Sequence, residues 1–158
     1  MMLRRNGTDR RAEGQALVEF ALIIPMFLAL LFGVIDLGRV IWANDSLASA
    51  AREGARYASV HAGTPALTTL ASKDEIRAHT RAFAVGGGDA SVQVCYSAVH
   101  YAGGTLGCSG DTDEAGAGYQ RGNLVTVTVT SQIPVLSGTL LGFGTFTVTG
   151  TSTVLINN

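Results

Sequence analysis

The stretch FALIIPMFLALLFGVI, Phe20–Ile35, carries no charged side chain. Flanking apolar residues extend it from Ala16 to Trp42, which gives roughly 25 mostly apolar positions where about 20 let a helix cross a bilayer. Pro25 would break a soluble helix, but lipid tolerates it where the freed carbonyl of Ala21 finds another partner. Trp42 falls where an interfacial aromatic anchor is expected. The stretch therefore predicts one membrane-spanning helix.

The orientation of this helix follows from the positive charges that precede it. Four arginines lie before the span: Arg4, Arg5, Arg10 and Arg11. A cytoplasmic excess of Lys and Arg places the N-terminus inside and the rest of the chain outside. The alternative is a cleavable secretory signal, and Ala48–Ala50 has the small residues of a cleavage site. Those residues lie well beyond the apolar core, after Asp36 and Asp45, so we favour a permanent span.

Composition predicts a small β-rich domain after the span. The chain has 158 residues, of which 15% are charged, and its formal net charge is −1. That balance offers no basic surface for nucleic acid. The second half is rich in Thr, Val, Ser and Gly, which favours strands and turns. We therefore expect an α+β fold, in which a long N-terminal helix and a second short helix accompany a small antiparallel β-sheet.

The long helix is expected to continue beyond Trp42 through Asn44–Val60 and to end at Gly63–Pro65. One stripe of this segment holds mostly small residues at helical spacing: Leu47, Ala51, Gly54, Ala55 and Ala58. Such a stripe permits close approach of a second element, either the chain's own sheet or a neighbouring helix. An ordinary amphipathic helix on its own domain explains the pattern equally well.

The remaining elements are also marked by local patterns. Ser72 and Glu75 form a capping box that predicts a short helix starting there and ending at Gly86–Gly88. Three segments alternate apolar and polar residues as strands do: Ser91–Val99, Leu124–Thr130 and Phe146–Ile156. Alternating Val and Thr predicts one buried and one solvent-facing side of an antiparallel sheet. An apolar loop containing Pro134, Leu136, Leu140, Leu141 and Phe143 joins the last two strands.

Glu19 is a carboxylate at the cytoplasmic edge of the apolar helix, where an ionisable side chain is costly and usually has a partner. Solvation at the headgroup level is the simple alternative. Its surroundings, EGQALVEF (Glu13–Phe20), resemble the processing site of Flp/Tad-class type IV prepilins. IDLGRV (Ile35–Val40) and AAREGARYAS (Ala50–Ser59) resemble the N-terminal signature of TadE-like pseudopilins, and the resemblance is close over about the first 60 residues.

The resemblance implies that an aspartyl prepilin peptidase cuts between Gly14 and Gln15. Glu19 and Phe20 would then be the fifth and sixth mature residues, where the family has Glu followed by an aromatic residue, and Pro25 also fits the pattern. The new amine and Glu19 of adjacent subunits are expected to neutralise each other within the membrane. Many pilins begin with Phe, whereas this mature chain would begin with Gln15, which leaves N-methylation of the new terminus open.

The implied organisation has three parts: a basic cytoplasmic leader (residues 1–14), a transmembrane helix with its extracytoplasmic extension (15–62) and an extracytoplasmic α+β domain (63–158). Asp36 and Arg39 share one side of the helix near its outer boundary, as an interfacial ion pair or as contacts with another subunit. Cys95 and Cys108 both fall outside the membrane, where a disulfide is favoured over metal binding.

Other polar clusters give weaker signals. Asp111, Asp113 and Glu114 form an acidic patch that we expect to be a solvated loop, with calcium binding as the alternative. The histidines, His61, His79 and His100, lack metal-ligand spacing.

The function implied by the resemblance is that of a minor pilin or pseudopilin that helps to assemble or prime a Flp/Tad-type (type IVb) adhesive pilus. The expected location is the bacterial inner membrane, as a single-pass protein, or the pilus itself. Expected partners are other pilins and pseudopilins, the assembly platform, the prepilin peptidase and membrane lipid.

No nucleophile elbow or phosphate loop is present, so we expect a non-enzyme without cofactor or metal. The alternatives are a membrane-anchored extracytoplasmic binding module, which needs no cleavage, and a major structural subunit, although those of this pilus class are usually far shorter.

Overall fold

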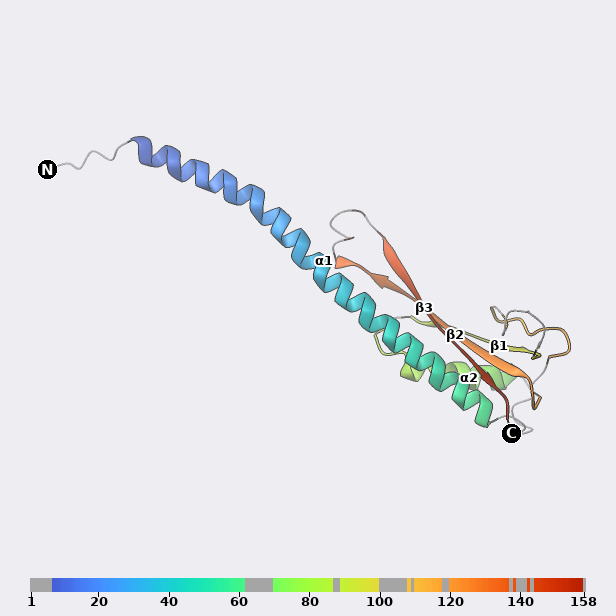
Figure 1. Cartoon of the computed structure of the whole chain (residues 1–158). Coiled ribbons are helices and arrows are strands. Elements are labelled where there is room, and N and C mark those ends of the chain that lie inside the picture. The colour runs from blue at the N-terminus through green and yellow to red at the C-terminus, as the bar shows by residue number, and fades with distance from the viewer. Residues whose placement is uncertain are drawn as a thin grey trace.

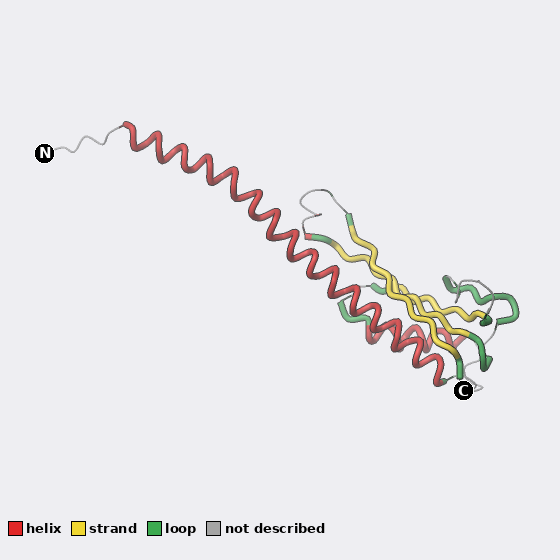
Figure 2. The backbone as a smooth tube through the Cα atoms, viewed as in Figure 1, coloured by secondary structure: helices red, strands yellow, loops and turns green. Residues whose placement is uncertain are grey.

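The computed structural model describes residues 7–61, 70–86, 89–99, 108, 110–117, 120–136, 138, 142 and 144–157. Its elements are α1 (Gly7–Val60), α2 (Leu70–Phe83), β1 (Ser91–Ser97), β2 (Leu124–Pro134) and β3 (Thr145–Leu155). The predicted α+β fold is confirmed. Half of α1 projects alone, and the other half lies along the sheet with α2 beside it (Figures 1 and 2).

The long helix α1 changes its surroundings along its length. From Gly14 to Ile35 its side chains are exposed, apart from half-buried Ile24 and Phe32, and the helix runs through Pro25 without a break. From Ala43 onwards one side is buried. From Phe20 to Ile35 this part is apolar on all sides, and no other described element covers it, as expected of a helix that meets lipid. The second part presents one narrow stripe of small residues to the sheet.

The sheet has the strand order β1-β2-β3, and both pairs are antiparallel. Alternate residues face α1 and form the core, among them Val92, Val94, Val125, Val127, Val129 and Val148. Threonines occupy the opposite face in directly facing pairs, with Oγ1 atoms 2.9 Å apart at Thr126 and Thr153 and 3.4 Å apart at Thr128 and Thr151. The predicted division between a valine face and a threonine face is confirmed.

Close backbone approach explains the small-residue stripe of α1. Leu47, Ala51, Ala55 and Ala58 have no exposed surface, and they pack within this chain. A Cβ atom on Gly54 would lie 2.2 Å from Oγ1 of Thr80 in α2, and one on Gly150 of β3 would lie 2.6 Å from backbone atoms of Leu47 and Ala48. The stripe therefore belongs to the intrachain interface between α1, α2 and the sheet.

Several predicted boundaries need correction. Helix α2 begins at Leu70, so Ser72 lies inside its first turn and is not the N-cap. Strand β2 runs four residues further than expected, to Pro134. Proline fits there because β1 pairs only as far as Thr130, and the missing N–H on the β1 side therefore costs no ladder hydrogen bond. Helix α1 ends at Val60, whereas Gly63–Pro65, Gly87 and Gly88, and Leu140, Leu141 and Phe143 lie outside the described residues.

We predict that Gly150→Ala lowers the unfolding free energy of the detergent-solubilised protein by about 3 kcal/mol, the upper end of the cost of overpacking. The added methyl group would meet the backbone of α1, which cannot rotate aside as a side chain can. The measurement is denaturant unfolding followed by Trp42 fluorescence. Gly144→Ala is the control, because a Cβ there meets no atom within 4 Å. Equal stability of the two variants would contradict the close α1–β3 contact.

Candidate interaction surfaces

The predicted processing residues lie on the projecting half of α1. Gly14 and Gln15 are exposed, and a Cβ on Gly14 would meet no atom within 4 Å. Together with Val18, Glu19 and Leu22 they line a shallow hollow on one side of the helix. All the lining residues belong to a single helix, and no other part of the chain that the structure describes covers this surface.

Glu19 and Phe20 follow on the same exposed segment. Phe20 is 60% exposed. In the part of the chain that the structure describes, Glu19 makes no hydrogen bond and no ion pair. The structure thus brings Gly14, Gln15 and Glu19 onto one side of α1, and leaves the carboxylate available to a group outside the chain.

Asp36 and Arg39 fasten the end of the β2–β3 hairpin to α1. An Asp36 Oδ1 atom accepts a hydrogen bond of 2.9 Å from the Leu136 N–H, and Asp36 is only 6% exposed. Arg39 Nη1 donates to the Pro134 carbonyl at 3.3 Å. The two side chains therefore contact backbone groups about 100 residues further along the chain, in addition to sharing one side of the helix. Sequence spacing could not identify these partners.

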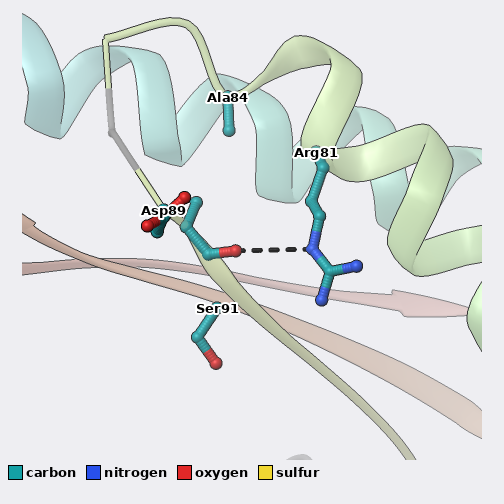
Figure 3. A pocket seen from close by; sticks show the side chains of 5 residues that line it. Arg81, Ala84, Asp89 and Ser91 are labelled. Atoms are coloured by element: carbon teal, nitrogen blue, oxygen red, sulfur yellow. Dashed lines mark hydrogen bonds between the residues drawn. The ribbon is translucent and has the colours of Figure 1, made fainter.

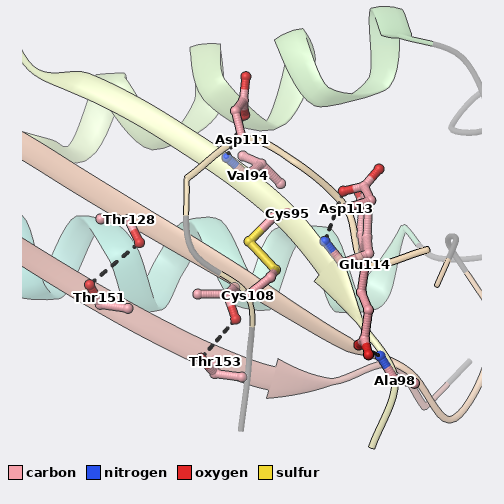
Figure 4. Close-up of a disulfide and its surroundings, with 12 residues drawn as sticks. Val94, Cys95, Ala98, Cys108, Asp111, Asp113, Glu114, Thr128, Thr151 and Thr153 are labelled. Carbon is pink, nitrogen blue, oxygen red and sulfur yellow. Dashed lines mark hydrogen bonds between the residues drawn. A yellow bond between two sulfur atoms is a disulfide. The ribbon is translucent and has the colours of Figure 1, made fainter. Parts of the chain in front are cut away.

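A disulfide draws the acidic segment against the sheet. Cys95 of β1 and Cys108 are bonded, with their Cα atoms 6.0 Å apart (Figure 4). Beyond Cys108, the chain of residues 110–117 runs beside β1, and Glu114 N–H donates to the carbonyl of Tyr96. The predicted disulfide is present, and it explains why the polar-face residue Cys95 is buried.

The acidic residues cap the outer edge of β1. Asp111 Oδ1 accepts from the Val94 N–H at 3.0 Å and Asp113 Oδ1 from the Tyr96 N–H at 2.9 Å. In the same way, Glu114 Oε2 accepts from Ala98 N–H at 2.9 Å (Figure 4). Asp111 and Asp113 are exposed, as expected of a solvated loop, and their carboxylates also bind the backbone of β1. These carboxylates occupy the donors of an edge strand, which otherwise offers a template for pairing with another strand.

Two cations of α2 hold these carboxylates from the other side. Lys73 Nζ lies 2.8 Å from Asp113 Oδ1, and the guanidinium of Arg77 pairs with Asp111. The hydrogen bond from Arg77, followed by the one from the Val94 N–H, lowers the pKa of Asp111 below its ordinary value although partial burial opposes the shift. The cluster therefore joins α2, β1 and the acidic segment electrostatically.

His61, just after α1, and His79 of α2 stack on the ring of Tyr57 in α1. Tyr57 stacks on His61 at a centroid distance of 4.0 Å and on His79 at 4.1 Å, and Phe83 lies beyond His79. The nearest carboxylate to His79 is that of Glu53, 3.7 Å from Nε2. Sequence spacing gave no sign of this cluster because its members come from two helices. His100 lies outside the described residues.

An open hollow of about 410 Å³ lies between the end of α2 and the start of β1, lined by Arg81, Ala84, Asp89, Ala90 and Ser91 (Figure 3). Arg81 Nε donates to the Ala90 carbonyl at 3.4 Å, which connects the two elements. The hollow has one cation and one carboxylate among its lining residues, and its arginine is already engaged with backbone. It provides structural contact and no evident acid–base pair.

Most of α1 matches a known family model. Residues 14–56 match the family model of TadE-like proteins. The TadE-like resemblance expected from the sequence is confirmed over this segment, which begins at Gly14 and includes Glu19, Asp36 and Arg39. The match covers 43 of the 158 residues. No curated protein and no solved structure matches the chain significantly.

The TadE-like segment also contains the candidate membrane span. Within the described residues, one helix is long and apolar enough to cross a bilayer, and none of its most apolar window is buried by the rest of the chain. It is compatible with single-pass anchoring. The family match adds to this observation, because length and composition alone are also met by signal sequences.

We predict that Asp36→Ala lowers the unfolding free energy by about 1–3 kcal/mol, because the Leu136 N–H loses a buried charged acceptor. Denaturant unfolding in detergent measures the change. Asp36→Asn keeps an oxygen acceptor at this position and should retain most of the stability. A loss in the Asn variant as large as in the Ala variant would show that the hydrogen bond to Leu136 is not the source of the effect.

The ion pair between Asp111 and Arg77 predicts that the unfolding free energy depends on pH. Because the folded pKa of Asp111 is lowered by Arg77, this carboxylate stabilises the fold above its unfolded pKa of about 3.9. The contribution is lost as the pH falls through the folded pKa. Asp111→Asn should therefore lose up to about 1 kcal/mol of unfolding free energy at pH 7. Its stability should also fall less than that of the unmodified protein below about pH 4.

The matched control for this titration is Asp45→Asn, since Asp45 is exposed on α1 and makes no hydrogen bond or ion pair among the described residues. Its acid unfolding curve should follow that of the unmodified protein. If Asp111→Asn also followed that curve, the Arg77 pair would contribute nothing to acid stability.

Proposed function

We propose that this TadE-like protein is a minor pilin or pseudopilin that takes part in the assembly or priming of a Flp/Tad-type adhesive pilus after cleavage by a prepilin peptidase. The observation that carries the proposal is the projecting segment of α1. It combines the family match with an exposed apolar surface and with Gly14, Gln15 and Glu19 on one side of the helix.

Cleavage between Gly14 and Gln15 would create a positive charge that can pair with the Glu19 carboxylate. The new α-amino group at Gln15 has an ordinary pKa of about 8 and is a cation at neutral pH. Gln15 and Glu19 are one helical turn apart, so the amine of one subunit and the carboxylate of its neighbour can meet where two parallel helices are staggered. Each charge alone is unfavourable in lipid, and the pair offsets much of that cost.

This pairing would also fix the axial register between subunits. Apolar side chains in lipid provide little preference for one register, because sliding one helix along another exchanges similar contacts. A single buried ion pair makes one register distinct, as polar residues do in other helix assemblies. Leu17, Val18 and Phe20, all more than half exposed, supply the packing surface around it.

The proposed location follows from the span and its flanking charges. The basic leader would lie in the cytoplasm, and the α+β domain would lie outside the inner membrane, where the Cys95–Cys108 disulfide can persist. Partners in this proposal are other pilins and pseudopilins, the assembly platform, the peptidase and lipid. The work of the protein is helix packing, so we propose a non-enzyme.

We predict that Glu19→Gln and Glu19→Ala leave membrane insertion intact and abolish pilus assembly, since both remove the charge and neither shortens the apolar helix. Pili are counted by electron microscopy of cells that express each variant, and insertion is measured by alkaline extraction of membranes. The matched control is Glu75→Gln on the exposed side of α2, which should assemble normally. Normal assembly by both Glu19 variants would refute the charge-pair mechanism.

The cleavage itself is tested by N-terminal sequencing of the membrane-extracted protein from cells with and without the prepilin peptidase. We expect a start at Gln15 only when the peptidase is present. An uncut chain that functions normally would favour a membrane-anchored binding module. A start at Ala51 would indicate a secretory signal and would contradict the span as well.

A further inference from the structure

The external domain exposes two large apolar side chains at the end of the β2–β3 hairpin. Leu136, just after β2, is 46% exposed, and Phe146, the second residue of β3, is 58% exposed. Phe146 lies opposite buried Ile133 in the strand register. Both residues lie at the end of the hairpin that points along α1 toward its N-terminal half (Figure 1).

The contacts with α1 set the depth of this hairpin end. Asp36 and Arg39 bind the backbone at Leu136 and Pro134, so the hairpin end lies level with the first charged residues after the apolar helix. Residues 14–35 would extend over about 33 Å as a helix, close to the thickness of the hydrocarbon core. Asp36 then marks the outer boundary, and Trp42 lies about 9 Å further along the helix.

The chemistry of the hairpin suits this depth. The sequence contains no Asp, Glu, Lys or Arg between residue 122 and its end, so neither strand of the hairpin brings a charged side chain to the membrane surface. Three backbone features of the described residues beside the hairpin end also suit this depth. Pro134 has no N–H, its carbonyl accepts from Arg39, and the Leu136 N–H donates to Asp36. Unpaired backbone groups would make such an insertion costly.

We propose that Leu136 and Phe146, at the end of the sheet where β2 leads into β3, form a second membrane contact in the outer-leaflet interface beside the transmembrane helix. The ligand is the phospholipid bilayer at the boundary between headgroups and acyl chains. The contact removes apolar side-chain surface from water, and this burial is favourable in proportion to its area. It rests on the membrane span of the proposed function.

A second membrane contact would restrict the orientation of the external domain more than the transmembrane helix does alone. A single helix can tilt in the bilayer toward any side, whereas a hairpin held in the interface beside it resists tilts that would lift the hairpin out of the interface or push it deeper. The threonine face of β2 and β3 and the capped edge of β1 would then keep constant directions relative to the membrane.

The test uses depth-dependent fluorescence. Trp42 is the sole tryptophan, so a Trp42→Phe background accepts single probes. Leu136→Trp and Phe146→Trp are compared with Thr151→Trp, on the exposed threonine face of β3. The full chain is reconstituted at high dilution in phosphatidylcholine–phosphatidylglycerol vesicles, with and without bromine on the upper acyl chain. Near-UV circular dichroism verifies that each variant is folded.

We expect blue-shifted emission at positions 136 and 146 and a loss of intensity in brominated lipid several times that at position 151. Iodide in the buffer should quench position 151 most strongly. The proposal is overturned if positions 136 and 146 respond to bromine and iodide as position 151 does. It is also overturned if their blue shift depends on the protein-to-lipid ratio and not on bromine, because that result would indicate contact with another subunit.

A fourth probe separates this inference from the membrane span. Ala29→Trp lies in the middle of the apolar helix and should be quenched by brominated lipid whenever the helix crosses the bilayer. Quenching at position 29 without quenching at 136 and 146 removes the hairpin contact and leaves the span. Absence of quenching at position 29 removes the span, and the hairpin contact with it.

Discussion

The rest of this structure depends on one constraint. A single continuous helix, α1, must fit two different surroundings. Helix α1 is apolar on all sides from Phe20 to Ile35, where no other described part of the chain covers it, and from Ala43 onwards it is buried on one side. The second half becomes part of the domain core through backbone contact at Gly150 and side-chain contact at Gly54. The folded domain and the projecting helix are therefore one rigid unit, without a linker between them.

Asp36 and Arg39 occupy the point where these two surroundings meet. A charged pair at this level stops the apolar run, and its bonds to Leu136 and Pro134 tie the far end of the sheet to the helix. A force or displacement applied to the projecting helix would pass directly into β2 and β3. In a protein proposed to act by helix packing, this coupling allows the position of the external domain to follow that of the helix.

The acidic segment, residues 110–117, covers the edge strand of the small sheet. β1 lies at one edge, and its outward N–H groups would be available to strands of other chains. Carboxylates of Asp111, Asp113 and Glu114 occupy these groups, and Lys73 and Arg77 balance their charge. Residues that suggest ion binding in the sequence are thus part of the device that keeps this edge from pairing.

The sequence by itself determined the parts of the fold that depend on local periodicity. The apolar run predicted α1, and alternating Val and Thr predicted three strands and the side of each that is buried. The two cysteines, both outside the membrane in the predicted topology, predicted the disulfide. The Glu13–Phe20 motif pointed to the family that residues 14–56 match. The helix and strand patterns repeat over neighbouring residues and the motif is eight residues long, so a short window contains each of these signals.

Only the tertiary structure decided which distant groups meet. The partner of Asp36 is an amide 100 positions away, and the partners of the acidic residues are backbone N–H groups of β1, which carry no side-chain signature. The stacked rings of Tyr57 and His79 come from two helices whose relative rotation depends on Gly54 and Thr80. Backbone donors are present at nearly every residue, so their pairing follows from packing geometry and cannot be read from the order of the side chains.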